Sequence, residues 1–281
     1  MTIIADCGST KIEWCVIDGN ETVKRIVTPG LNAMMLTEEE MSQFFSSEVS
    51  HHFSGLTIDN IYFYGAGCIN ETVNGRVARA LASCLQGPTV IEVQSDLLAA
   101  ARALCGHEAG IACIMGTGSN SSLYDREEIA EHVSPLGYIL GDEGSGASLG
   151  RLLIGDVLKG QLPRPLCDSF LSQFQLSTQE ILNRVYLDPQ PNRFLASVSR
   201  FLIDNMEEPA IHRLVLNEFK AFFVRNIYHY TGYKKLPVNF VGSIAYHYKD
   251  VLGEAAAAVD CHIGTIMVSP MDGLIAFHTH Q

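Results

Sequence analysis

The chain lacks the features that mark membrane-spanning and secreted proteins. None of its apolar runs is long enough to cross a bilayer, and its first residues include neither the basic region nor the cleavage site of a signal peptide. Residues 3–5 are instead predicted to form a first β-strand. We therefore expect a cytoplasmic protein that has no membrane partner.

Basic residues are scarce. Among 281 residues, 19 Lys and Arg stand against 31 Asp and Glu, which gives a net charge of −12. This charge argues against nucleic acid as a partner, because proteins bind nucleic acid largely by neutralising its phosphates with Lys and Arg. It does not exclude a nucleotide, whose phosphates backbone amides and Mg²⁺ can neutralise locally.

Several ligand-binding patterns are missing as well. The eight cysteines include no CxxC pair and the ten histidines show no ligand spacing, which favours reduced, mostly buried thiols over a metal centre. The GxxxxGK[ST] phosphate loop is absent, and no GxGxxG fingerprint occupies the first strand-to-helix turn. Neither of those two nucleotide-binding folds is therefore predicted.

Strand and helix patterns alternate along the chain, which predicts an α/β fold with partly parallel sheets. With 281 residues, of which 47% are hydrophobic, the chain is long enough for two domains. We place the first domain at residues 1–104 and the second at 105–269, with a closing helix in 270–281 packing back on the first. The longer predicted helices cover 37–49, 71–85, 96–105, 145–159, 192–206, 209–230 and 243–259.

A strand-turn-strand pattern occurs twice, about a hundred residues apart, and each time an apolar strand runs into a turn of small residues. The two turns are Gly8-Ser9-Thr10-Lys11 and Gly116-Thr117-Gly118-Ser119-Asn120. Glycine permits close backbone approach, and successive N–H groups in such a turn form a concavity that binds anions. Two such turns in one chain predict a phosphate-bearing ligand that is held from two sides.

Two aspartates stand at the ends of predicted strands. Asp6 comes directly before the first turn, where a carboxylate can hold Mg²⁺ directly or through water; the alternative is an Asp that bonds its own turn. Asp96 follows the strand 90–93 and begins a helix. Transfer of a phosphoryl group to an alcohol needs a carboxylate that accepts the hydroxyl proton, whereas the alternative role for Asp96 is only to complement the helix dipole.

A glycine-rich segment over 135–146 carries the adjacent acids Asp142 and Glu143. These acids are able to accept hydrogen bonds from sugar hydroxyls, and Tyr138 to contact a sugar ring; the alternative is a flexible loop or hinge with capping acids. Gly242-Ser243 follows the strand 238–241 and begins a helix. Within a nucleotide-binding fold this turn would lie against adenosine, and taken alone it is only a strand-to-helix turn.

Together and in this order, these segments resemble the actin/hexokinase/heat-shock-chaperone ATPase superfamily. Within it, the chain is similar to the N-acetylglucosamine kinase-like members of the BadF/BadG/BcrA/BcrD ATPase family, over nearly its whole length. The resemblance implies two RNase H-like (actin-like ATPase) domains, with ATP and Mg²⁺ in an interdomain cleft, and a homodimer. The zinc-binding cysteine cluster of repressor-type sugar kinases is missing, which disfavours that branch.

The resemblance also implies roles for single residues. Asp96 matches the general base, Asp6 is assigned to Mg²⁺, and Asn32 matches an asparagine that binds the sugar. The two small-residue turns become phosphate loops, through Gly8, Ser9, Thr10, Lys11, Gly116, Thr117, Gly118 and Ser119, and Gly242 and Ser243 become the adenosine turn. To the sugar site we assign Asn32, Asn120, Gly137, Tyr138, Asp142 and Glu143.

The expected activity is ATP-dependent phosphorylation of an amino sugar, first of all N-acetylglucosamine to its 6-phosphate. Tyr138 stands where such kinases can carry Trp, which bears on the preference for the acetamido group and not on the kinase chemistry. The alternative is an ATPase that activates a protein partner through a shared iron–sulfur cluster, as in 2-hydroxyacyl-CoA dehydratase activators, because Cys113 lies just before Gly116. A non-catalytic sensor has no support, since Asp96 and both turns are intact.

Overall fold

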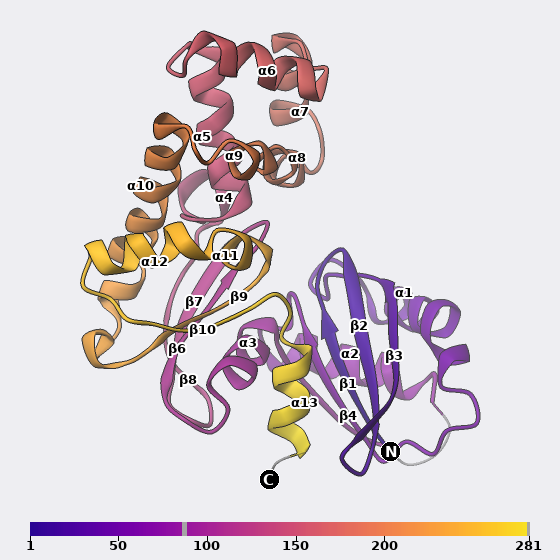
Figure 1. Cartoon of the computed structure of the whole chain (residues 1–281). Coiled ribbons are helices and arrows are strands. Elements are labelled where there is room, and N and C mark those ends of the chain that lie inside the picture. The colour runs from indigo at the N-terminus through magenta and orange to yellow at the C-terminus, as the bar shows by residue number, and fades with distance from the viewer. Residues whose placement is uncertain (86–88, 280–281) are drawn as a thin grey trace. The chain divides into compact units, whose positions relative to one another are not determined.

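The computed structural model describes residues 1–85 and 89–279 (Figure 1). The chain divides into two compact units: unit 1 comprises Met1–His107 and the C-terminal segment from Pro270, and unit 2 comprises Glu108–Ser269. Each unit contains one five-stranded mixed sheet with helices, so the predicted α/β class with two related halves is confirmed. None of the helices in the described ranges is both long and apolar enough to span a bilayer.

The sheet of unit 1 has the order β3-β2-β1-β4-β5. Its strands are β1 (Thr2–Cys7), β2 (Lys11–Asp18), β3 (Glu21–Pro29), β4 (Asn60–Gly65) and β5 (Val90–Ser95). β1 pairs antiparallel with β2, which pairs antiparallel with β3, whereas β1, β4 and β5 are parallel. β1, β3, β4 and β5 consequently all run in one direction, and the segments that follow them emerge at one edge of the sheet.

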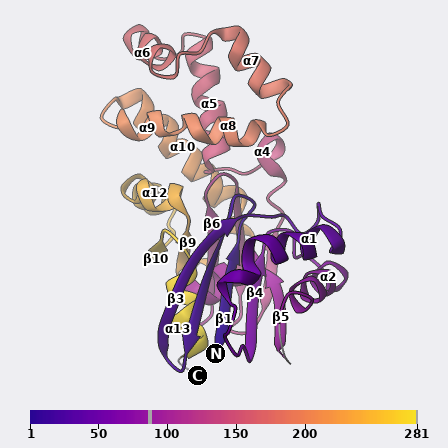
Figure 2. The ribbon, with the colours of Figure 1, turned by 90° about the vertical axis from the view of Figure 1, so that its right-hand side faces the viewer.

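Helices cover both faces of this sheet. They are α1 (Glu38–Phe44), which continues as the π-helical turn η1 (Phe45–Val49) and the 3₁₀ turn η2 (Ser50–His52), α2 (Glu71–Ala82), α3 (Asp96–Cys105) and α13 (Met271–Thr279). Trp14, Phe45 and Phe63 belong to the buried cluster on one face, and Ile4, Tyr64 and Leu274 to the cluster on the other. Figure 2 shows α1 and α2 on the opposite side of the sheet from α13.

The sheet of unit 2 repeats this connectivity. Its strands are β6 (Gly110–Met115), β7 (Ser119–Tyr124), β8 (Ile129–Val133), β9 (Val238–Val241) and β10 (Ile263–Met267), in the order β10-β9-β6-β7-β8. β6 takes the place of β1, with β7 antiparallel on one side and β9 parallel on the other. The two strand-turn-strand patterns of the sequence are thus the central hairpins β1–β2 and β6–β7.

The helices of unit 2 are shorter than the sequence predicts. They are α4 (Gly137–Leu140), α5 (Gly146–Leu158), α6 (Arg164–Phe174), α7 (Thr178–Tyr186), α8 (Pro191–Val198), α9 (Arg200–Asp204), α10 (Pro209–Arg225), η3 (Ile227–His229), η4 (Tyr233–Lys235), α11 (Ser243–His247) and α12 (Lys249–Ala258). The predicted helix 192–206 is divided at Ser199 and the predicted helix 243–259 at Tyr248. The two breaks contact each other, because the Tyr248 hydroxyl donates to the Ser199 carbonyl at 2.8 Å.

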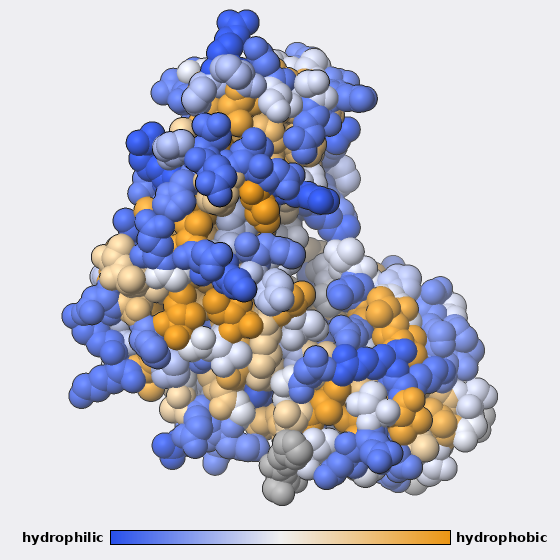
Figure 3. Space-filling model, viewed as in Figure 1, coloured by the Kyte–Doolittle hydropathy of each residue, from blue (hydrophilic) through white to orange (hydrophobic). Residues whose placement is uncertain are grey.

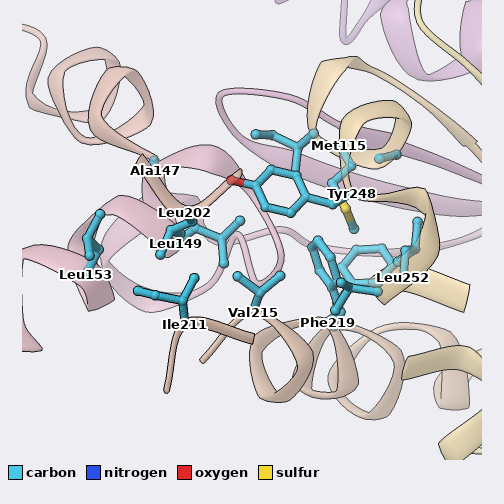
Figure 4. Close-up of a cluster of buried hydrophobic side chains, with 14 of the residues drawn as sticks. Met115, Ala147, Leu149, Leu153, Leu202, Ile211, Val215, Phe219, Tyr248 and Leu252 are labelled. Carbon is cyan, nitrogen blue, oxygen red and sulfur yellow. The ribbon is translucent and has the colours of Figure 1, made fainter. Parts of the chain in front are cut away.

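α10 carries the apolar core of unit 2. Ile211, Val215 and Phe219 are fully buried along one side of it, as the periodicity predicts, and Figure 4 shows them with Leu149 of α5 and Met115 of β6. Burying a side chain of this size stabilises a fold by about 1.5–3 kcal/mol, so α10 is firmly held. Figure 3 shows hydrophilic residues over most of the helical part of unit 2, with smaller hydrophobic patches between them.

The C-terminal helix α13 completes unit 1. Gly273 lies against α3, where a Cβ at that position would stand 2.3 Å from the Ala103 carbonyl oxygen. Near the end of α13, the His278 Nε2 atom lies 2.8 Å from the Tyr64 hydroxyl, which also accepts a hydrogen bond from Arg102 at 2.8 Å. The predicted helix extended to His280, and residues 280 and 281 lie outside the described part of the chain.

We predict that His278 makes stability depend on pH. Burial, and then the Arg102 charge, lower the pKa of His278 to about 4, against 6.5 for an unperturbed histidine. Between these values the unfolded chain binds a proton that the folded protein does not, so the free energy of unfolding falls as the pH drops. At pH 5 this loss is about 2 kcal/mol at most, because the ring is only partly buried.

Urea denaturation of the wild type and of His278→Gln at pH 7.5 and pH 5 measures this effect. The variant should lose less stability between the two pH values than the wild type does. Equal losses in both proteins would show that His278 does not titrate in this range.

Candidate active site

The first turn lies between β1 and β2 and is closed by its own backbone. Gly8 N–H donates to the Lys11 carbonyl at 3.0 Å, and Gly30 N–H donates to the Thr10 carbonyl at 3.0 Å. A Cβ on Gly30 would stand 2.3 Å from the Gly8 carbonyl oxygen, so the segment after β3 supports the turn directly. Ser9, Thr10 and Lys11 are exposed, which leaves their side chains facing solvent at the edge of the sheet.

Two carboxylates lie in a poorly solvated position at this edge. Burial raises the pKa of Asp6 to about 7; the charges of Asp96 and Glu13 add to the rise, and Lys11 opposes it. Burial also raises the pKa of Asp96, against a hydrogen bond from the Leu97 N–H. A divalent cation would relieve this negative charge, and the oxygen donors are those that Mg²⁺ prefers, so the residues fit the ion.

The local sequence explains how Asp96 is held. Ser95 caps α3 by accepting from the Leu98 N–H at 3.2 Å, and Gly106 ends the helix at φ +58°, both as predicted. Because Ser95 performs the capping, Asp96 is not needed for it. The carboxylate is therefore available for a role beyond the helix dipole.

Asn32 is fixed at the same edge of unit 1, after β3. Its Oδ1 atom accepts from the Met34 N–H at 3.0 Å, and the Ala33 N–H donates to the Ala66 carbonyl beyond the end of β4 at 3.2 Å. Gly67 has φ +82°, and a Cβ there would stand 2.3 Å from Asn32 Oδ1. The structure thus brings Asp6, the first turn, Asn32 and Asp96 to one edge of one sheet.

The second turn lies between β6 and β7 in unit 2. Gly116 N–H donates to the Gly118 carbonyl at 2.9 Å, which closes the turn. Gly146 N–H donates to the Gly116 carbonyl at 2.8 Å and Ala147 N–H to the Thr117 carbonyl at 3.0 Å. The start of α5 is therefore hydrogen-bonded directly to the turn.

Asp142 lies against the second turn. A Cβ on Gly118 would stand 3.1 Å from Asp142 Oδ2, so only glycine allows the carboxylate this close without adjustment. Burial raises the pKa of Asp142 to about 6; a hydrogen bond from the Ser119 N–H opposes the rise, and the Glu143 charge adds to it. Asp142 itself has φ +52°, a left-handed conformation that is uncommon for residues other than glycine.

The neighbouring Glu143 has different partners. Its Oε1 atom lies 2.6 Å from Arg225 Nε, and its Oε2 atom accepts from Asn226 Nδ2 at 3.3 Å. Its side chain is only 12% exposed. The two adjacent acids, which the sequence assigns to the same sugar, are thus held by different partners in the structure.

The remaining predicted sugar residues also lie in unit 2. Tyr138 is in the short helix α4, half-buried and packed on the core of unit 2, while Gly137 is exposed with φ +76°. Asn120 Oδ1 lies 2.9 Å from His132 Nε2 and accepts from the Ser121 N–H at 2.9 Å. These bonds fix the orientation of the Asn120 amide group.

Two neighbouring cavities in unit 2 join the second turn to the predicted adenosine turn. One, of about 260 Å³, is lined by Gly116, Thr117, Arg193, Ala196, Ser197, Ser243 and Ile244. The other, of about 470 Å³, is lined by Ala196, Ser199, Arg200, Ile203, Asp204, Ser243, Ile244 and His247. The two cavities share Ala196, Ser243 and Ile244, and together they offer room of the size that a small-molecule ligand needs.

Sequence reasoning missed part of this lining. Arg193, Arg200, Asp204 and His247 come from α8, α9 and α11, and the sequence has no local motif that marks them. A larger cavity of about 660 Å³ in unit 1 is lined by residues 50, 51, 53–58, 84 and 85, which include none of the predicted site residues. No three His, Cys, Asp or Glu side chains come together as a metal-ligating group within the described ranges.

A comparison with solved structures finds a close relative in Porphyromonas gingivalis. This protein, named "Putative N-acetylglucosamine Kinase", is 45% identical over 100% of this chain and 99% of its own, with a TM-score of 0.96. The chain belongs to the family of this protein. No family model and no curated protein matches the chain.

More distant structures share only the fold. A second "Putative N-acetylglucosamine Kinase", from Chromobacterium violaceum, is 18% identical over 98% of each chain, with a TM-score of 0.75. A ROK family glucokinase from Streptomyces griseus, in complex with glucose and AMPPNP, is 14% identical over 98% of this chain and 97% of its own, with a TM-score of 0.54. Both support the two-sheet kinase fold for the family.

We predict that Gly242 is indispensable for the hollow in unit 2. It has φ +127°, and a Cβ there would stand 2.4 Å from the Met115 carbonyl oxygen, so alanine forces the backbone to move. Gly242→Ala should lower the free energy of unfolding by about 2–4 kcal/mol.

Gly253 in α12 is the matched control. A Cβ there meets no atom within 4 Å, so Gly253→Ala should be neutral or stabilising by up to about 1 kcal/mol. Guanidinium denaturation of both variants measures the difference. Equal stability of the two would contradict the tight approach at Gly242.

Proposed function

We propose that this protein is an ATP-dependent sugar kinase that phosphorylates an amino sugar, with N-acetylglucosamine and its 6-hydroxyl as the first expectation. The proposal rests on the full-length likeness, at 45% identity, to the P. gingivalis protein of that printed name. The site geometry supports it independently within each unit. We further propose the BadF/BadG/BcrA/BcrD ATPase family, a cytoplasmic location and a homodimer.

In this proposal ATP binds along the two neighbouring cavities of unit 2 that share Ala196, Ser243 and Ile244. Its adenosine lies at Gly242 and Ser243, and its phosphates reach the turn from Gly116 to Ser119. The first turn, from Gly8 to Lys11, supplies further donors from unit 1. Mg²⁺ at Asp6, through water, would supply the positive charge that neutralises the phosphates.

Asp96 is the proposed general base. Its carboxylate accepts the proton of the attacking hydroxyl, and its raised pKa brings it closer to neutral pH, where a base is most effective. The N–H groups of the two turns donate to the transferring phosphoryl group. Asn32, Asn120, Gly137, Tyr138 and Asp142 are proposed to orient the sugar.

Glu143 fits a supporting role better than direct contact with the sugar. Both oxygens of its carboxylate already have partners, Arg225 and Asn226. We propose that Glu143 lies near the sugar site and supports Asp142, its neighbour in the chain.

The two compact units are proposed to act as the two kinase domains. The base and the first turn belong to unit 1, while the cavities and Asp142 belong to unit 2. The reaction therefore requires residues of both units to act on the same substrates.

The activator alternative finds no structural support. It depends on Cys113, which is fully buried in the core cluster of unit 2. A cluster held between two subunits needs thiolates at a surface, so Cys113 is a core residue in this fold.

ADP release from MgATP is the direct test. The panel comprises N-acetylglucosamine, N-acetylmannosamine, N-acetylmuramic acid, glucosamine, glucose and no sugar, with the product checked by mass spectrometry. We expect strong stimulation by one amino sugar together with formation of its phosphate. If the rate of ADP release is the same with and without each sugar, the protein would instead be an ATPase that acts on a protein partner.

Asp96→Asn tests the base. The change removes the proton acceptor while keeping the size of the side chain, so kcat should fall by about 100-fold or more. Binding of ATP, measured by calorimetry, should change little. Asp18→Asn, at an exposed position at the end of β2, is the control and should leave kcat unchanged.

A further inference from the structure

Polar side chains in the middle and at the C-terminal end of α10 hold the loop that carries Asp142. Glu218 Oε1 accepts two hydrogen bonds, from the Gly144 N–H at 3.1 Å and from the Ser148 hydroxyl at 2.5 Å. Arg225 and Asn226 hold the Glu143 carboxylate. Three residues of α10 and its C-cap thus contact two adjacent residues of the loop, Glu143 and Gly144.

The position of α10 is set by packing. Phe219, next to Glu218, is fully buried in the cluster shown in Figure 4. Gly144 lies directly on this face, since a Cβ there would stand 2.9 Å from Met115 Cε and 3.3 Å from the Phe219 ring. Core packing therefore fixes the distance between α10 and the loop. The hydrogen bonds to Glu218 fix the orientation of the loop backbone.

The loop is in turn bonded to the second turn. The Ser119 hydroxyl donates to the Glu143 carbonyl at 2.8 Å, and Gly146 N–H donates to the Gly116 carbonyl at 2.8 Å. A continuous set of hydrogen bonds runs from α10 through residues 142–147 to the turn at 116–119. A shift of the loop would displace Asp142 and the turn together.

From these contacts we infer that Glu218 is a positioning residue: it fixes the loop so that Asp142 and the second turn keep one geometry toward the sugar and the phosphates. This inference rests on the proposed function. Glu218 touches no substrate in it, and acts only through the Gly144 N–H and the Ser148 hydroxyl. An acceptor, rather than a negative charge, is what these two donors require.

The surroundings of Glu218 make it suitable for substitution. Its side chain borders a cavity of about 370 Å³ that is also lined by Leu152, Asp156, Arg213 and Asn217. Shortening a side chain at the wall of an existing cavity removes few packing contacts. Variants at this position should therefore fold.

Kinetics with the full chain provide the first test. Glu218→Ala should raise the KM for the sugar about 10-fold and lower kcat, with a smaller change in the KM for ATP. Glu218→Gln keeps an oxygen acceptor, so it should recover most of the lost activity. Asn217→Ala, an exposed neighbour on the same helix, should behave as wild type.

Wild-type kinetics in Glu218→Ala would overturn the inference. So would a Glu218→Gln variant as impaired as Glu218→Ala, because the acceptor role would then be wrong. Thermal unfolding of all three variants, which should occur near the wild-type temperature, separates positioning from loss of the fold.

Hydrogen exchange tests the same inference without any activity. Backbone amides in 141–147 should exchange faster in Glu218→Ala than in the wild type, Glu218→Gln or Asn217→Ala. If the wild type shows no sugar-dependent ADP release, the proposed function fails, while this measurement still decides whether Glu218 holds the loop. Unchanged exchange in Glu218→Ala would overturn the inference by itself.

Discussion

The pairing of one central strand determines where everything else in each unit lies. β1 pairs antiparallel with β2 and parallel with β4, and β6 pairs in the same way with β7 and β9. A hairpin turn and the ends of parallel strands must then share an edge of the sheet. With β3 and β5 paired on the outer sides of β2 and β4, Asp6, Asn32 and Asp96 lie at that edge in unit 1, and the second turn lies with Gly242 at the matching edge in unit 2.

Both edges hold ionisable groups where water is scarce. Burial raises the pKa of Asp6 to about 7 and that of Asp142 to about 6, and raises the pKa of Asp96 as well. Keeping such carboxylates out of water destabilises the fold unless a ligand compensates them. Partly buried acids whose pKa values stay raised fit a surface shaped for cations and hydroxyl groups better than one shaped for stability.

Local patterns allowed the sequence to predict the central hairpins, the helix caps at Thr37 and Ser95 and the capping box at Ser177. The sequence did not predict interactions between residues that lie far apart in the chain. The edge strand β3 buries only Ile26 and Thr28, and β8 alternates between half-buried and exposed residues without burying any, so the apolar signal of both strands is weak. Contacts such as Glu218 with Gly144 join segments 74 positions apart, and no local signal encodes them.

The place of α13 in the chain has a consequence for biosynthesis. Unit 2 is continuous, whereas unit 1 needs a segment that follows the whole of unit 2 in the chain. Until α13 emerges, Ile4 and Tyr64 on that face of the first sheet lack the contact with Leu274. The half that is translated first therefore completes its core only after unit 2, and during the synthesis of unit 2 this face of the nascent chain is covered by α3 without α13.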